Sequence, residues 1–211
     1  MSKMKLGGSA DVNAVTFFCN RYGIGIKAER KEDGSVSISE VSMTDYYSNM
    51  ILAIELLLGT GVFKELVILL NLPNALYYAV CAFWLIITFF AIMQVRHDET
   101  CLYHGAEHKV GNWHDKKFKK DITKCSRIHR RCGTNIIATI TTFQIVGAIA
   151  LWVYNIHIPE ILISGLPFLV SSIFPFNIFG LCIQLLTTKE PRNEHLEVAM
   201  KAYAVLMHKI K

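Results

Sequence analysis

Apolar residues are grouped in long blocks from about the middle of the first hundred residues onwards, rather than spaced at a regular period. Residues 75–95 contain no charged side chain, and at about 1.5 Å per helical residue they are long enough to cross the roughly 30 Å hydrocarbon core of a membrane. Residues 134–186 contain one formal charge, Glu160, and form a block too long for one crossing. The pattern therefore predicts two spans there, at residues 136–156 and 161–186.

Residues 50–70 are also apolar, but Glu55, Lys64 and Glu65 interrupt them. Such a segment crosses a membrane only if its charges face other helices. Two alternatives stay open at this point: a further span, or a re-entrant or interfacial segment.

The N-terminal segment, residues 1–49, has a different pattern. Ile24, Ile26 and Ala28 alternate with polar residues or glycine, which is typical of a half-buried strand. The sequence EDG at residues 32–34 predicts a hairpin turn in which Gly34 supplies a positive φ. We therefore expect a small β-rich unit.

The last segment predicts an amphipathic helix, because its apolar residues recur at helical spacing. The chain is thus divided into residues 1–49, a β-hairpin-rich unit; residues 50–95, two apolar segments of which the second is a clear span; residues 96–133, a polar segment with the candidate motifs; residues 134–186, two spans; and residues 187–211, the amphipathic helix.

Composition and charge favour a membrane protein. Hydrophobic residues make up 52% of the chain. Lys and Arg are plentiful in the three polar segments and absent from the turns at residues 71–74 and 157–160. By the positive-inside rule, both termini and the motif segment are cytoplasmic. The sequence therefore predicts a mainly α, polytopic helical membrane protein with a small β-rich N-terminal unit and a cytoplasmic motif-bearing segment. It is expected to be a multi-pass protein of the cell membrane, with the lipid bilayer as its partner.

The candidate chemistry begins with the run YHGAEHK at residues 103–109. On a helix, His104 and His108 share one face, and Glu107 stands beside them. Two neutral imidazoles can hold a metal ion, and an adjacent carboxylate can take a proton from metal-bound water. The order His-x-x-Glu-His is that of the inverted zinc-protease motif. The alternative is a polar helix whose histidines only form hydrogen bonds.

A second group of ligand-type residues follows about twenty residues later. Cys125, His129 and Cys132 have helical spacings of four and three residues, and a reducing cytoplasm would keep both thiols free or metal-bound. Four protein ligands would indicate a closed structural zinc site, and three plus water an open catalytic one. The expected cofactor is a divalent metal, with zinc preferred.

Three arginines lie between these ligands: Arg127, Arg130 and Arg131. They form either a basic patch facing lipid headgroups or a group that holds a substrate anion. Aromatic residues do not alternate with them and no nucleic-acid reader motif is present, so no nucleic-acid partner is expected. The sequence indicates no particular oligomeric state.

Taken together, three runs resemble the YqhQ-like bacterial membrane proteins, a family with a domain of unknown function and predicted metal-dependent activity. The runs are YHGAEHK at residues 103–109, HRRCGT at residues 129–134, and the stretch at residues 186–199 that begins LTTKEP and ends LEVA. The resemblance implies that one site contains His104, Glu107, His108, His129 and Cys132, with Glu190 and Glu197 as further members.

These observations favour a metal-dependent hydrolase at the cytoplasmic membrane face. Glu107 would be its general base and Arg127 or Arg131 its anion-holding group, while Cys125 is a further candidate ligand. The substrate would be a lipid or a segment of a membrane protein. A membrane scaffold or regulator stabilised by a closed metal site is the non-catalytic alternative. A di-iron oxygenase is disfavoured, because it needs about eight histidine ligands and the chain has 8 histidines in all. Of these, His157 would lie on the other side of the membrane and His208 lies in the tail.

Overall fold

The computed structural model describes residues 6–42, 73–119, 121–154 and 178–211, together with residues 66, 69–70 and 166. The chain divides into two compact units. The first contains residues 1–48, 94–131 and 185–211, and the second contains residues 49–93 and 132–184. The three polar segments of the sequence therefore belong mainly to one unit, although they are far apart along the chain.

The first unit is built on a four-stranded antiparallel sheet in the order β1-β2-β3-β4. The strands are β1 (Gly7–Ala10), β2 (Ala14–Cys19), β3 (Ile24–Arg30) and β4 (Val36–Ser42). The predicted hairpin turn joins β3 to β4, with Gly34 at a φ of 80°. Each strand pairs with the next one in sequence, so the sheet forms from local connections.

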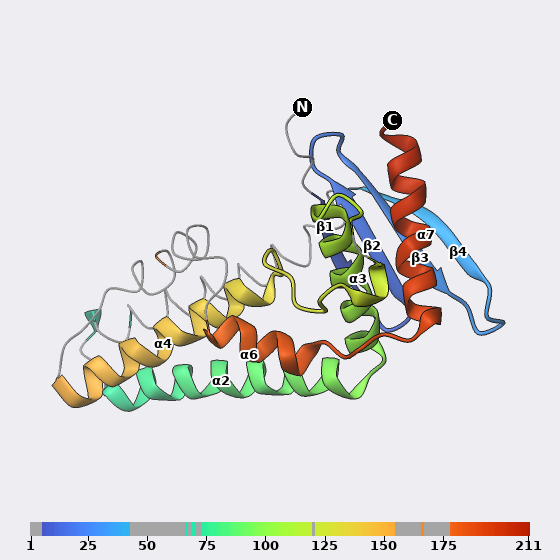
Figure 1. The fold of residues 1–211 in the computed structure, drawn as a ribbon. Coiled ribbons are helices and arrows are strands. Elements are labelled where there is room, and N and C mark those ends of the chain that lie inside the picture. Colours follow the sequence, from blue (N-terminus) through green and yellow to red (C-terminus); the bar gives the residue numbers. More distant parts are fainter. Residues whose placement is uncertain are drawn as a thin grey trace. The chain divides into compact units, whose positions relative to one another are not determined.

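Two helices cover one face of this sheet (Figure 1). Helix α3 (Thr100–Asp115) contacts β1 and β2, and helix α7 (Asn193–Lys209) contacts β2 and β3. A short 3₁₀ helix, η1 (Ile122–Lys124), follows α3 and contacts it. Apolar residues of the sheet and both helices form one core, for example Phe17, Ala106 and Leu206. This packing fixes the face of α3 that carries the candidate motif.

The second unit contains most of the apolar helix α2 (Asn74–His97), helix α4 (Thr134–Tyr154) and the start of α6 (Ile178–Thr187). Tyr77 and Cys81 of α2 pack near Ala148 of α4, and Trp84 packs on Ile140. Gln184 of α6 donates a hydrogen bond of 2.9 Å from Nε2 to Asn135 Oδ1 of α4.

The prediction of a polytopic helical membrane protein is wrong. Among the described residues, one helix, Ala75–His97, is long and apolar enough to cross a membrane, and the next apolar helix, Ile137–Ala150, is shorter. Much of the remaining described chain is the sheet with its two covering helices, which has a core of its own. Local hydropathy could not reveal this unit, because its core joins segments that are far apart in sequence. A single candidate span also removes the argument that placed both termini on the cytoplasmic side.

Several sequence expectations concern residues that the structure does not describe. They are most of the apolar segment 50–70, the turn at 157–160, and the first part of the span expected at 161–186.

Candidate metal centre

One face of α3 carries the residues from which the site is built. His104, His108, Gly111 and Asp115 succeed one another at intervals of four, three and four, so they form one stripe along the helix. The rings of His104 and His108 lie 4.3 Å apart between centroids. Their ligand nitrogens lie within 4.8 Å of each other, which is close enough for both to bind one ion.

Hydrogen bonds to main-chain carbonyls orient both of these imidazoles. His104 Nδ1 lies 3.1 Å from the carbonyl oxygen of Thr187, and His108 Nδ1 lies 2.6 Å from that of Arg127. A carbonyl oxygen only accepts, so each Nδ1 is the N–H donor and each Nε2 carries the lone pair. This is how protein imidazoles that bind metal through Nε2 are usually oriented.

His108 provides a test of whether the pocket fits a metal ion. Its Nε2 is buried and has no hydrogen-bond partner among the residues that the structure describes. A buried acceptor without a partner costs free energy, and coordination to an ion would remove that cost. The two neutral imidazoles are donors that zinc accepts, and the carboxyl group of Glu107 lies beside them.

His129 completes a row of three imidazoles. Its ring centroid lies 5.6 Å from that of His108. A Cβ at Gly111 would come within 3.3 Å of His129 Nε2, so the glycine leaves room for this ring against α3. The same Nε2 lies 3.4 Å from Asp115 Oδ2, a carboxylate–histidine pair of the kind that supports metal ligands.

Asp115 is held ionised. Arg131 donates a hydrogen bond of 2.9 Å to its other oxygen, Oδ1. Burial alone would raise the pKa of Asp115, but the bonds from His129 and Arg131 outweigh it and hold that pKa well below its usual range. His129 therefore has a permanently charged partner on one side of its ring.

Burial keeps the two α3 histidines neutral at neutral pH, as metal ligands must be. It lowers the pKa of His104 to about 4, although the hydrogen bond to Thr187 acts in the opposite direction. It also lowers the pKa of His108 well below its usual value, and the neighbouring His104 and His129 add to this effect.

Glu107 lies beside the same histidines and in an apolar setting. Its Oε2 is 4.0 Å from His104 Nε2. Burial raises the pKa of Glu107 to about 8, so it is mostly protonated at neutral pH in the absence of a nearby cation. A Cβ at Gly8 of β1 would collide with Glu107 Oε1, so this glycine leaves space for the carboxyl group.

The arginines expected to hold an anion bind groups of the chain itself. Arg127 Nη1 donates to the carbonyl oxygen of Thr188 and lies 3.3 Å from the Thr188 hydroxyl. Arg131 binds Asp115. Both are therefore placed to position the histidines, Arg127 through its own carbonyl oxygen and Arg131 through Asp115.

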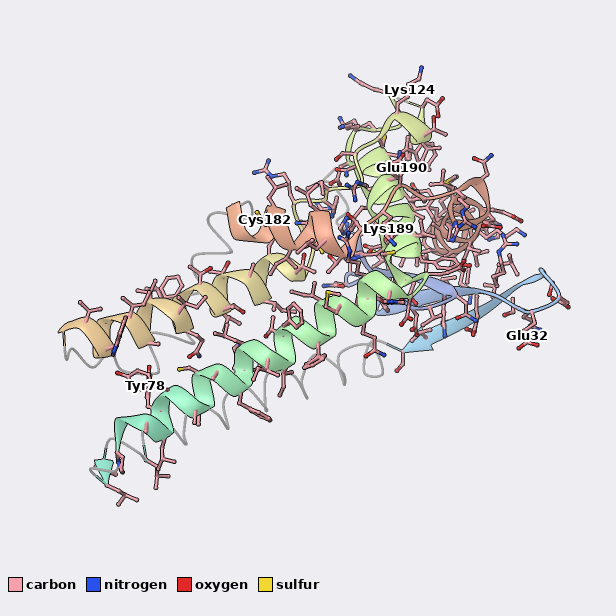
Figure 2. The ribbon with its side chains drawn as sticks, turned by 90° about the horizontal axis from the view of Figure 1, so that it is seen from below. Glu32, Tyr78, Lys124, Cys182, Lys189 and Glu190 are labelled. Atoms are coloured by element: carbon pink, nitrogen blue, oxygen red, sulfur yellow. The ribbon has the colours of Figure 1, made fainter. Side chains whose placement is uncertain are left out.

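The two glutamates raised by the family resemblance bind basic side chains. Glu190 forms an ion pair with the buried ammonium group of Lys109, and Figure 2 shows Glu190 and Lys189 beside α3. Glu197 is half exposed and pairs with Arg30 at 3.0 Å and with Lys201 at 2.7 Å. In the described part of the chain, neither carboxylate has an ion pair with the histidine cluster.

The two cysteines are placed differently. The Cys125 thiol is buried, and its Sγ lies 3.6 Å from the carbonyl oxygen of Asp121. Cys132 is the first residue of the 132–184 segment of the second unit, and its Sγ lies 3.0 Å from Thr134 Oγ1. Its membership of the site stays a prediction from its spacing of three residues after His129.

The sequence alone identified neither Asp115 as part of the site nor the burial of His195. Asp115 follows His108 by seven residues, and this helical spacing was the available signal. His195 is fully buried, with its ring centroid 4.6 Å from that of Tyr103. Nothing in the local sequence predicts that burial, because it depends on α7 packing against α3.

The family described as "Protein of unknown function (DUF1385)" matches residues 26–209, most of the chain. The chain belongs to this family. It is also 33% identical over 129 residues to the "Uncharacterized protein YqhQ" of Bacillus subtilis (strain 168). That match covers 50% of this chain and 39% of the relative, so the chain spans well under half of the relative's length.

The family membership confirms the resemblance to YqhQ-like proteins. The metal-dependent activity and membrane location that the resemblance implies stay predictions. No solved structure is significantly similar to the chain.

Proposed function

We propose that the chain is a metal-dependent hydrolase. His104 and His108 would hold a divalent ion, preferably zinc, through their Nε2 atoms, with His129 as a third ligand. The observation that supports this most is the buried Nε2 of His108, which has no hydrogen-bond partner in the described structure and lies beside the similarly oriented His104. Cys132 is the fourth candidate ligand, by its spacing from His129 alone.

Glu107 is the proposed general base. A divalent ion held by the imidazoles would supply a Lewis acid and would favour the ionised form of this carboxyl group. Glu107 Oε2, 4.0 Å from His104 Nε2, is near the proposed ion without replacing the imidazole as ligand. Once ionised in this way, Glu107 would be able to accept a proton from a water molecule beside the histidines.

The residues around the site exclude water and fix the ligands. Glu107 and His108 are buried under the sheet, Arg127 ties Thr188 to the site, and Asp115 orients His129. The substrate is proposed to be a lipid or a membrane-protein segment, because α2 is an apolar helix of membrane-spanning length that could attach the chain to a bilayer.

The alternative is a metal-stabilised scaffold without catalysis. His108 and Glu107 are deeply buried, which favours this scaffold alternative. A closed four-ligand site completed by Cys132 would leave no position for a substrate.

Glu107→Gln separates these two functions. The purified full chain would be loaded with zinc and assayed against phosphate esters, carboxylic esters and peptides. For the hydrolase, Glu107→Gln keeps its metal but loses activity by at least 100-fold, since the amide cannot accept the proton. The exposed turn variant Glu32→Gln is the control. Metal-loaded wild-type protein that hydrolyses none of the three substrate classes would contradict the hydrolase proposal and favour the scaffold.

A further inference from the structure

A basic turn follows α3 directly beside the Asp115–His129 pair. Lys116, Lys117 and Lys119 line a hollow of about 390 Å³ together with Asp115. All three lysines are exposed. Within the described ranges of the chain, none of their ammonium groups has an ion pair or a side-chain hydrogen bond.

The hollow has an excess of positive charge. The carboxylate of Asp115 is its one acidic group, and Arg131 and His129 already bind both oxygens of that carboxylate. The arginines that the sequence suggested for anion binding are used within the chain, as described above. Three unpaired ammonium groups around Asp115, the partner of His129, therefore supply the positive charge that those arginines do not.

The backbone of this turn is held in a costly conformation. Lys117 and Phe118 have φ values of 53° and 62°, in the left-handed region that residues other than glycine rarely adopt. The Phe118 ring lies 4.5 Å from that of Trp113 and 6.5 Å from that of Tyr203, between centroids. The N–H of Phe118 also donates to the Trp113 carbonyl oxygen at 3.1 Å. These contacts hold the backbone that carries the lysines in one conformation. A basic loop without a defined role would not need a backbone held in this way.

We infer that this hollow binds a phosphate group of an anionic ligand, placing it next to the proposed metal centre. The inference deepens the proposed function, on which it rests for the view that the ligand is a substrate. Ammonium groups bind phosphate as point charges without a fixed bidentate geometry, so three of them suit a tetrahedral anion in an open hollow.

Two sources of phosphate share this chemistry, a lipid headgroup and a free phosphate. We would titrate the full chain, in a neutral detergent, with inorganic phosphate, with a soluble short-chain phosphatidylglycerol, and with the zwitterionic phosphatidylcholine of the same chain length. Each titration is made once with zinc and once with a chelator. The test variant replaces Lys116, Lys117 and Lys119 with Gln. Gln is similar in size to Lys and must adopt the same backbone conformation in the turn. The control replaces Lys31, Lys201 and Lys211 with Gln, which removes the same charge elsewhere in the first unit.

We expect the wild type to bind inorganic phosphate or phosphatidylglycerol both with and without zinc. Binding should weaken about 100-fold in the test variant, because each lysine should contribute as it does beside anionic lipids. The control should bind as the wild type does, and the preferred probe identifies the source of the phosphate. Binding that is absent from the wild type, that falls equally in the control, or that requires zinc would overturn the inference. A chain that holds no metal but binds phosphate through these lysines would overturn the proposed hydrolase while leaving the hollow as a phosphate site.

Discussion

At the scale of single residues, the contact that each histidine ring makes with a carbonyl or carboxylate oxygen distinguishes the site from an ordinary group of polar side chains. His104 and His108 each donate from Nδ1 to a carbonyl oxygen, and His129 lies against a carboxylate. These interactions fix which nitrogen of His104 and His108 is left to bind an ion.

Asp115 gives a direct test of this arrangement. Asp115→Asn should weaken zinc binding by about 10–100-fold, because the neutral amide no longer orients and polarises His129. Competition with a chromogenic chelator measures the change. Asp11→Asn, in an exposed turn, is the matched control. Equal zinc affinity in Asp115→Asn and wild type would show that His129 is not a ligand.

The raised pKa of Glu107 predicts that the stability of the metal-free protein depends on pH. Its pKa is about 8 when folded and near 4.5 when unfolded, so between these values the folded chain binds one more proton than the unfolded chain. The contribution of Glu107 to stability is therefore present below pH 4.5 and is lost as pH rises towards 8, at about 1.4 kcal/mol per pH unit. Glu107→Gln removes this loss, so its stability relative to wild type should increase over that range.

Thermal or denaturant unfolding in chelator at pH 5 and pH 8 measures the difference. Glu32→Gln, in the exposed turn, should track the wild type at both values. An unchanged difference between Glu107→Gln and wild type at the two pH values would mean that Glu107 is not buried in the folded protein.

The sequence alone predicted the positions of some of these residues but not the interactions of others. The four-residue spacing of His104 and His108 is local, so a helix alone brings them together. His129 and Glu107 were also named, but the hydrogen-bonding roles of Arg127, Arg131 and Glu190 were not. The roles of Arg127 and Glu190 depend on the chain returning to α3 at residues 187–190, and that of Arg131 depends on its contact with Asp115. No local pattern reports which acceptor an arginine will meet.

At the scale of elements, the close contact between α3 and the segment after α6 holds the site together. The Lys189 N–H donates to the Cys101 carbonyl oxygen at 2.8 Å, and Thr187 binds His104. Gly105 permits this approach, since a Cβ there would come within 2.0 Å of the Lys189 carbonyl oxygen.

Gly105→Ala should therefore destabilise the fold by about 1–3 kcal/mol and weaken zinc binding, because the added methyl group meets backbone that cannot rotate away. Unfolding curves and chelator competition measure the two effects. Gly133→Ala is the control, since a Cβ at Gly133 has open space around it. A Gly105→Ala chain as stable as Gly133→Ala would contradict the close approach.

Helices were easier to predict than strands. The uncharged segment 75–95 corresponds to α2 (Asn74–His97), and the expected span at 136–156 corresponds to α4 (Thr134–Tyr154). Strand β2, with the sequence AVTFFC, was not predicted because both of its faces are buried and it shows no alternation. Strand β1 was not predicted either, because it begins with two glycines, which are typical of turns, and Gly8 makes room for Glu107.

At the scale of the whole molecule, the separation into two units explains why the polytopic prediction failed. Hydropathy identifies α2 correctly as apolar, but it does not report that residues 6–42, 94–131 and 185–211 share one core. That core depends on contacts between distant segments, which periodicity along the chain does not contain.

The apolar helix α2 leads to a prediction about membrane attachment. The full chain should remain with membranes after a carbonate wash, and Ile86→Lys with Phe90→Lys should release much of it, since each lysine near the centre of a span costs about 2.5–3.5 kcal/mol. Both side chains are mostly exposed, at 52% and 65%. Ile86→Leu with Phe90→Leu is the control. Wild-type chain in the soluble fraction would contradict attachment through α2.

The metal content of purified chains tests the central claim most directly. Wild type and two variants, His108→Ala and His195→Ala, would be purified after zinc loading and analysed for bound metal. His195 is the matched control, because it is a fully buried histidine of the same unit that packs on Tyr103 outside the stripe of His104 and His108. We predict about one zinc per chain in wild type and in His195→Ala, and almost none in His108→Ala, since losing one of three or four ligands removes most of the affinity. Full zinc in His108→Ala, or no zinc in wild type, would contradict a metal centre at this site.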